Sequence, residues 1–186
     1  MVARTTTFMK QYPVIHTERL LLRNFKSSDK NDLKILAGDF EIADTTLNVP
    51  HPYEKGIAEK WLTKLQEDFE DGKGLFFAIT LVTDRQLIGT IGLKDINHEH
   101  SHAELGYWIG KKYWNRGYAT EAAVTVIKYG LTTMNLNRIF AFHYTRNPAS
   151  GKVLEKAGMK YEGTMRSHIR KWDKFEDIAF YGIVKM

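Results

Sequence analysis

Apolar residues recur at helical spacing in four parts of the chain. In the clearest of them every fourth position is apolar, so these side chains share one face of a helix and are expected to pack in a core. The four positions are Ile57, Trp61, Leu65 and Phe69. One predicted helix begins at 27–29, where short oxygen-bearing side chains can cap it, and the others cover about 54–71, 117–131 and 148–157.

Between the helices lie short runs rich in β-branched and aromatic residues, which predict strands. They cover 19–23, 75–82, 86–96, 103–109, 138–143, 159–165 and 175–184. The three strands between 75 and 109 are expected to form an antiparallel meander with turns near 84–85 and 98–102. The order of elements predicts an α/β (α+β) domain in which one mixed sheet carries helices on both faces.

The composition is that of one ordinary globular domain. The 186 residues carry 27 Lys and Arg against 22 Asp and Glu, a formal charge of +5, and 43% of them are hydrophobic. These values exclude a disordered chain and a rod. We expect a flexible arm over residues 1–13, which lacks the apolar segment of a secretory signal, and a single domain over 14–186. No apolar run approaches the roughly 20 residues that cross a bilayer, so a cytoplasmic protein is expected.

Residue types exclude or disfavour several kinds of chemistry. The chain has no cysteine, which excludes disulfides, thiolate nucleophiles and cysteine-ligated zinc. His98, His100 and His102 alternate before Glu104, but the turn expected there breaks the alternation, so no metal site is predicted. The positive charge forms no block of five like charges, and nucleic acid is therefore not expected as a partner.

The most informative stretch joins a strand to a helix through a short basic loop. The helix begins at Gly117, where the missing Cβ lets the backbone approach a ligand, and Ala119 keeps the next turn small. Free N–H groups and the helix dipole make such a helix start a site for anions. Positive charge is added by Lys111, Lys112 and Arg116. The alternative is a plain connection with a solvated basic loop. Neither the P-loop nor the dinucleotide-binding glycine motif is present.

Together with the preceding strand, this stretch resembles the acetyl-CoA motif of the GNAT superfamily of N-acetyltransferases. The similarity is carried by residues 103–109, Ala-Glu-Leu-Gly-Tyr-Trp-Ile, and 114–122, Trp-Asn-Arg-Gly-Tyr-Ala-Thr-Glu-Ala. More narrowly, the chain resembles the ribosomal-protein N-terminal acetyltransferase (Rim-type) subgroup. That resemblance covers roughly 15–184 and includes residues 17–23, 147–150, 154–159 and 177–184. One position departs from the general motif, because Trp114 stands where Gln or Arg is usual.

The resemblance implies a GNAT fold, with a largely antiparallel sheet of about seven strands that splays at the acetyl-CoA site. It also implies that acetyl-CoA is the cosubstrate and that a primary amine is the acceptor. The loop and helix start would hold the pyrophosphate, and a backbone N–H near Trp108 or Ile109 would polarise the thioester carbonyl. The expected cofactor-binding residues are Trp108, Ile109, Asn115, Arg116, Gly117, Tyr118, Ala119, Thr120, Asn147 and Lys152.

Two of these assignments have simple structural alternatives. Asn147 is expected to bond the pantetheine arm or to hold the end of its strand, but it also suits a turn before Pro148. Lys152 is expected to reach a phosphate of the coenzyme, but a solvated helix lysine fits the pattern nearly as well.

Two residues are candidates for proton transfer. Glu104 can draw a proton from the incoming amine through a water, because an α-amine with a pKa near 8 is only about one unit from neutral pH. Its alternative is a strand carboxylate that faces solvent or a basic neighbour. Ser150 stands where the resemblance implies a donor for the leaving thiolate, since the helix at 148–157 has no tyrosine. Its alternative is a hydroxyl that caps that helix.

Several functions remain open at this point. The first is acetylation of a protein N-terminal α-amine, as in the ribosomal-protein subgroup, by a monomer or homodimer that binds no membrane. The same chemistry on an amino acid, polyamine or drug, a non-catalytic acyl-CoA-binding protein, and a basic nucleic-acid-binding module are the alternatives. The acceptor loops near 48–53 and 168–174 carry no readable code, and 168–174 is interpreted as a solvated hairpin rather than a border of the acceptor site.

Overall fold

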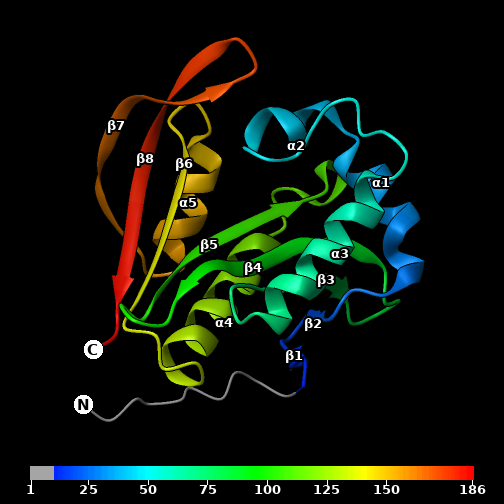
Figure 1. Cartoon of the computed structure of the whole chain (residues 1–186), viewed down its shortest axis with the longest axis horizontal. Coiled ribbons are helices and arrows are strands. Elements are labelled where there is room, and N and C mark those ends of the chain that lie inside the picture. Colours follow the sequence, from blue (N-terminus) through cyan, green and yellow to red (C-terminus); the bar gives the residue numbers. More distant parts are fainter. Residues whose placement is uncertain (1–10) are drawn as a thin grey trace.

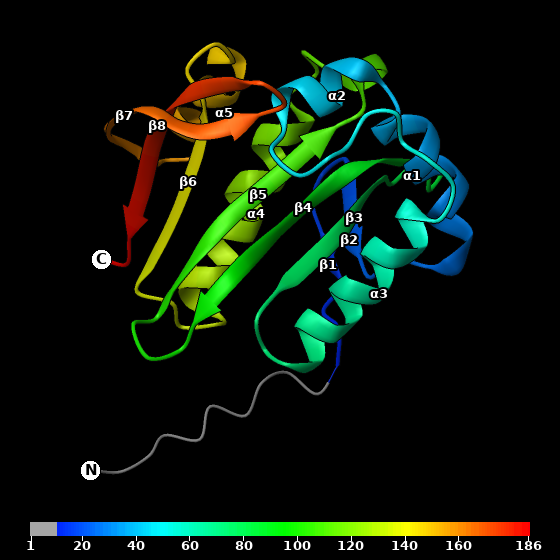
Figure 2. The same cartoon turned by 45° about the horizontal axis from the view of Figure 1, so that its top comes forward.

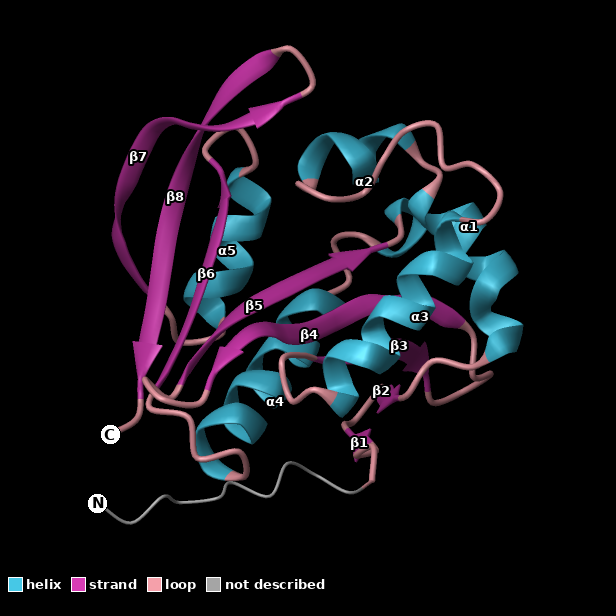
Figure 3. Ribbon diagram, in the orientation of Figure 1, coloured by secondary structure: helices cyan, strands magenta, loops and turns pink. Residues whose placement is uncertain are grey.

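A single sheet of eight strands, with helices on both faces, organises the chain (Figures 1 and 3). The computed structural model describes residues 11–186, and its strands follow the order β1-β2-β3-β4-β5-β6-β8-β7. Every neighbouring pair is antiparallel except β5 with β6. The predicted fold class is therefore confirmed, with one short strand, β1, beyond the seven expected.

The bounds of the elements are as follows. The strands are β1 (Ile15–His16), β2 (Leu20–Arg23), β3 (Leu75–Leu81), β4 (Leu87–Asn97), β5 (His102–Ile109), β6 (Arg138–Tyr144), β7 (Lys160–Lys171) and β8 (Lys174–Val184). The helices are α1 (Lys30–Ala37), α2 (Phe40–Thr45), α3 (Ile57–Glu70), α4 (Tyr118–Thr132) and α5 (Pro148–Lys156), with short 3-10 turns at Ser27–Asp29 and Lys111–Tyr113.

Two helices sandwich the central strands. In Figure 2, α3 lies in front of β3 and β4, whereas α4 runs behind β4 and β5. Small side chains let α4 approach closely, because a Cβ on Gly130 would lie 2.7 Å from the Cδ1 atom of Ile139. Fully buried side chains such as Phe77, Ile91 and Leu93 fill the layers between helices and sheet. This apolar core holds β4 and β5 rigidly beneath the candidate site.

The pairing between β5 and β6 ends early. The two parallel strands pair over His102–Glu104 and Arg138–Phe140 only, after which β5 pairs with β4 alone and β6 with β8 alone. Their far ends diverge and leave the backbone of β5 from residue 105 onwards without a neighbour on that side. The first turn of α5 lies at this opening, since the Tyr107 hydroxyl on β5 hydrogen-bonds to Ser150. The splayed sheet that the family resemblance implied is present.

Several local features differ from the prediction. Helix α2 was not anticipated, because six residues between two loops are too short to show a helical period. Strand β7 runs to Lys171, six residues beyond its predicted end at 165, so the hairpin of β7 and β8 is long. Of the expected flexible arm, residues 1–10 lie outside the described residues, and Tyr12 packs 4.5 Å from the ring of Phe69. Within residues 11–186 no helix is long and apolar enough to cross a membrane.

Candidate active site

The larger cavity lies at the opening between β5 and α5, and we call it the helix-start cavity. Its volume is about 410 Å³. The end of β5, the loop before α4, the first turn of α4 and the first two turns of α5 form its walls. Among the expected cofactor-binding residues, those that line it are Trp108, Ile109, Asn115, Gly117, Tyr118, Ala119, Thr120, Asn147 and Lys152.

The loop before α4 adopts a backbone that few residue types tolerate. Asn115 has φ 60° and Gly117, the N-cap of α4, has φ 80°. Asparagine and glycine are the residues that enter this left-handed region most readily, which explains their use here. The turn directs the start of α4 at the cavity, and the N–H groups of a first helical turn have no partner within the helix. The wall is therefore suited to a phosphate.

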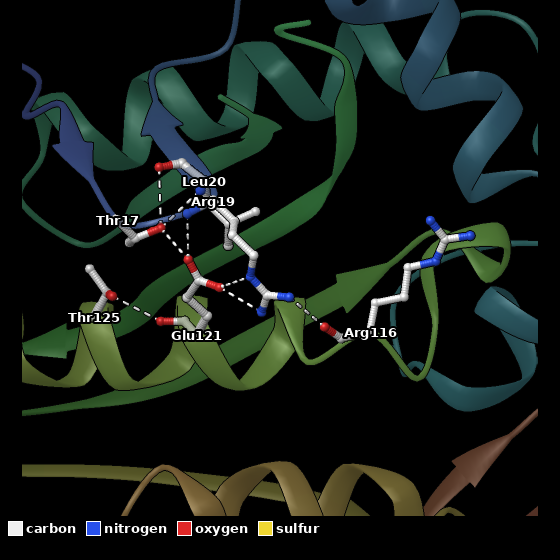
Figure 4. Close-up of polar contacts among 6 residues, drawn as sticks. All are labelled: Thr17, Arg19, Leu20, Arg116, Glu121 and Thr125. Carbon is white, nitrogen blue, oxygen red and sulfur yellow. Dashed lines mark hydrogen bonds and ion pairs between the residues drawn. The ribbon is translucent and has the colours of Figure 1, made fainter. Parts of the chain in front are cut away.

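The cationic side chains near the loop are placed differently from the expectation. Lys111 forms an ion pair with Glu41 on α2, and Lys112 lies over the ring of Tyr113. Arg116 does not line the cavity, and Figure 4 shows its side chain directed away from the first turn of α4. The positive charge at the cavity wall comes instead from α5, where Lys152 and Lys156 lie one turn apart. Lys156 was missed by the sequence analysis because it resembles any solvated helix lysine.

Trp114, at the departure from the family motif, has a defined role in this fold. Its indole N–H donates to the backbone carbonyl of Ile109 at 2.5 Å, and the half-exposed ring forms part of the cavity wall. The side chain therefore closes the end of β5, where the strand has lost its partner.

The second cavity is smaller and lies on the other side of β5, and we call it the aromatic cavity. Its volume is about 230 Å³, and its apolar walls include Tyr53, Trp61, Phe76, Phe142 and Tyr144. Trp61, interpreted from its spacing as a core residue, is half-buried and lines this cavity while Leu65 and Phe69 are buried. The two cavities share a few lining residues at the opening of the sheet, namely Thr45, Thr46, Tyr107, Trp108 and Ser150.

Glu104 lies in the wall of the aromatic cavity beside a lysine. Its carboxylate is 2.8 Å from the Nζ atom of Lys94, the residue opposite it on β4, and the Glu104 side chain is 13% exposed. Burial raises the pKa of Glu104, and the ion pair with Lys94 opposes that effect. The carboxylate is the only acidic group among the residues that line this cavity. Glu104 thus has the basic neighbour that the structural alternative expected. Its position in the wall of a cavity also suits a general base.

Ser150 connects the two cavities through a hydroxyl pair. Its Oγ atom is 2.8 Å from the Tyr107 hydroxyl, which also donates to the Ser150 carbonyl at 3.1 Å. Burial raises the pKa of Tyr107 well above its usual range, so its hydroxyl stays protonated at neutral pH. Asn147, and not Ser150, is the residue that caps α5. The side-chain oxygen of Asn147 accepts from the Ser150 backbone N–H at 3.4 Å. Tyr107 was missed because nothing in its strand pattern shows that it faces α5.

The long hairpin of β7 and β8 contacts the loop after α2, which lines the aromatic cavity. Lys171 is buried, and its Nζ atom donates to the carbonyls of Leu47 and Val49 at 3.1 and 3.2 Å. Both partners line the cavity. Next to it, the ring of Trp172 stacks on Phe40 with 5.5 Å between centroids. The segment interpreted as a solvated hairpin therefore borders the site, because Lys171 and Trp172 find partners on the loop after α2 and on α2 itself.

A match to a family model decides the identity of this fold and site. Residues 19–160 match the model of the acetyltransferase (GNAT) domain. The chain belongs to the GNAT acetyltransferase family. It is an acetyl-CoA-dependent N-acetyltransferase, and the free wall of β5 and the backbone at Gly117 suit the pantetheine arm and phosphates of that cosubstrate. Among residues 11–186 there is no cluster of three His, Cys, Asp or Glu side chains able to hold a metal.

Relatives of this GNAT protein have been described in several bacteria. It is 29% identical over 175 residues to the uncharacterized N-acetyltransferase YoaA of Bacillus subtilis, covering 94% of this chain and 98% of that one. It is 28% identical over 120 residues to the ribosomal protein uS5-alanine N-acetyltransferase of Escherichia coli, covering 64% and 61% of the two chains. Among solved structures, a GNAT-family acetyltransferase from Bacillus anthracis has a TM-score of 0.81 at 29% identity, covering 93% and 99%.

Replacing Gly117 by Asp should weaken binding of CoA to this GNAT protein by about 2 kcal/mol or more, because the new side chain would point at Arg19, 3.3 Å from its Nη2 atom, and would add a negative charge at the helix end that suits the phosphates. Calorimetric titration with CoA measures the effect. Gly56→Asp is the matched control, since Gly56 is the N-cap of α3 and has φ 92°. The control carries the same backbone strain and should bind CoA normally. Wild-type affinity in Gly117→Asp would place the phosphates elsewhere.

Proposed function

We propose that this GNAT enzyme acetylates the N-terminal α-amine of a protein, of the ribosomal-protein type, with the amine entering the aromatic cavity. The observation that carries the proposal is the single carboxylate of the aromatic cavity, Glu104, which lies among largely apolar walls and pairs with Lys94. A carboxylate suits an α-amine as its base, because an α-amine with a pKa near 8 needs little assistance at neutral pH. The similarity to an enzyme that acts on alanine of uS5 supports the same class of acceptor, and a cytoplasmic location would follow from it.

The charge of the aromatic cavity argues against a polyamine. A second ammonium on the acceptor would need a second carboxylate, because burying an unpaired charge is costly. Glu104 is the only acidic residue lining this cavity, and Lys94 partly neutralises it. The walls instead suit an acceptor with one amine and an apolar neighbour, such as a terminal residue with a small hydrophobic side chain.

A small single amine is the second candidate, and the modest volume of the aromatic cavity, about 230 Å³, favours it. The contacts of Lys171 with Leu47 and Val49 hold the loop after α2 over the aromatic cavity. A free amino acid is small enough to enter a cavity of this size whole, whereas a polypeptide would place only its terminal residue there.

Each step of the transfer falls to a named residue. Acetyl-CoA supplies the acetyl group as a thioester, and the backbone near Trp108 and Ile109 donates to its carbonyl oxygen. Glu104 takes the proton from the amine through a water as the new C–N bond forms. Ser150 gives a proton to the sulfur as the C–S bond breaks and regains one from solvent, and the hydrogen bond between the Tyr107 and Ser150 hydroxyls holds the Ser150 side chain in place.

A panel of acceptors tests the class of substrate. The enzyme is incubated with acetyl-CoA and peptides with free N-termini, the same peptides with blocked N-termini, free amino acids and spermidine, and release of the CoA thiol is followed. The free peptides should give the highest kcat/KM and the blocked peptides no turnover above background. A preference for free amino acids would favour the second candidate, and a preference for spermidine would contradict the charge argument.

Substituting Ser150 by Ala should lower kcat by about 10²-fold or more and leave the affinity for acetyl-CoA nearly unchanged, because a proton donor acts mainly in the transition state. Tyr107→Phe should lower kcat in the same way. The double variant should be no slower than Ser150→Ala, since both act on one proton. If Ser150→Ala loses stability by about 1 kcal/mol and its folded fraction turns over normally, the residue serves the helix and has no role in the reaction.

Changing Glu104 to Gln should lower kcat/KM by about 10²-fold or more near pH 7, and the deficit should shrink as pH rises. An α-amine is largely neutral by about pH 9 and then needs no base, whereas a lysine-like amine with a pKa near 10.4 would still need one. The measurement is kcat/KM against pH for both proteins. If the ratio of wild-type to variant kcat/KM stays constant between about pH 7 and pH 9, Glu104 is a structural residue and not the base.

The variant Lys94→Met tests independently whether Glu104 is the base. Loss of the ammonium removes an effect that lowers the pKa of Glu104, so that pKa should rise further. A base works only when deprotonated, and the acidic limb of kcat/KM should therefore move to higher pH. If the acidic limb of the pH profile stays where it is in the wild type, the ionisation of Glu104 does not control kcat/KM.

A further inference from the structure

A network of polar contacts holds the first turn of α4 from the side of β1 and β2 (Figure 4). Glu121 lies in this turn, and its Oε1 atom accepts from the Thr17 hydroxyl at 2.6 Å and from the Arg19 backbone N–H at 2.9 Å. Its Oε2 atom accepts from two nitrogens of the Arg19 guanidinium, Nε and Nη2, each at 2.7 Å. Both carboxylate oxygens are thus saturated by the segment between β1 and β2.

The same guanidinium reaches the backbone of the phosphate loop. Its Nη1 atom donates to the carbonyl of Arg116 at 2.9 Å, and the group lies over the ring of Tyr118, 4.7 Å from the centroid. Arg19 therefore joins a side chain of α4 to the loop that precedes it. These residues come from positions about one hundred apart in the chain, so the link depends on the tertiary fold.

Holding the Arg116 carbonyl determines which way the next N–H points. In a trans peptide the C=O and N–H bonds point in opposite directions. With its oxygen turned toward Arg19, the peptide between Arg116 and Gly117 directs the Gly117 N–H away from Arg19. Gly117 lines the helix-start cavity, whereas Arg19 does not, and α5 forms the opposite wall. The contact thus presents a backbone donor on the side where the phosphates bind.

The charge of Glu121 makes the contact necessary. A carboxylate in the first turn of α4 lies at the same helix end as a bound pyrophosphate and would repel it. Although partial burial raises the pKa of Glu121, the hydrogen bonds from Thr17 and Arg19 outweigh it and hold that pKa below its usual value. Glu121 stays ionised at neutral pH, and the Arg19 guanidinium is the cation that balances it.

We propose that Arg19 is a positioning residue for the CoA pyrophosphate: it balances Glu121 and holds the Arg116 carbonyl so that the backbone N–H at Gly117 faces the cavity. Arg19 itself does not touch the coenzyme. A planar guanidinium can satisfy Glu121 and the carbonyl together, while the single ammonium of a lysine satisfies them poorly. The proposal concerns the cosubstrate and is independent of the acceptor.

The test compares a ligand that has phosphates with one that has none. In Arg19→Lys, the dissociation constant for CoA, measured by calorimetry, should rise about tenfold or more, as expected for lost hydrogen bonds to charged groups. Pantetheine, which lacks the pyrophosphate, should inhibit acetyl transfer by the variant and by the wild type with the same Ki. A residue that merely stabilises the fold would not distinguish the two ligands.

Two further variants keep the result interpretable. Arg138→Lys changes a similar arginine–glutamate pair, between Arg138 and Glu162, away from both cavities, and should leave CoA binding unchanged. Glu121→Gln removes the repelling charge but frees Arg19, so CoA should bind more weakly if positioning dominates. Unchanged CoA affinity in Arg19→Lys, or an equal loss for CoA and pantetheine, would overturn the proposal. So would CoA binding in Glu121→Gln that is as tight as in the wild type.

Discussion

The early end of the β5–β6 pairing is the constraint on which the rest of the site depends. Three residue pairs hold the strands together, and beyond Glu104 and Phe140 each strand pairs only with its other neighbour, β5 with β4 and β6 with β8. A paired strand has no backbone groups to offer, whereas the unpaired edge of β5 does. The separation also gives α5 room to bring its first turn against Tyr107. One interruption in a sheet thus creates a binding edge and the wall opposite it.

The two cavities differ in polarity because different elements build them. The helix-start cavity takes its wall from a helix terminus and two lysines, which suit phosphates. The aromatic cavity takes its wall from side chains of β3, β6 and α3, and contains one carboxylate. They meet at Tyr107, Trp108 and Ser150, so a group at the junction touches both environments. An acetyl group passed from an anionic carrier to a neutral amine requires such a junction.

Local patterns predicted the elements but not the contacts between distant ones. The helix at 117–131 and the strand at 103–109 have strong periods, and both lie within one or two residues of their predicted bounds. Glycine and asparagine at the phosphate loop also indicated its shape. The role of Tyr107 depends on α5, and that of Lys171 on carbonyls more than one hundred residues away. A solvated and a buried lysine look alike in a sequence until the fold places the acceptors.

The departure at Trp114 follows from the way in which the phosphate loop is held. Where the family motif has Gln or Arg, this chain has an indole that donates to the Ile109 carbonyl and cannot carry charge to a phosphate. The Arg116 side chain does not replace it, because only its backbone carbonyl takes part, as the acceptor of Arg19. The phosphate loop itself therefore offers backbone N–H groups to the pyrophosphate, while Lys152 and Lys156 of α5 supply charge from the opposite wall. A site built in this way tolerates changes in its own side chains but depends on whatever fixes the backbone, which here is an arginine outside the motif.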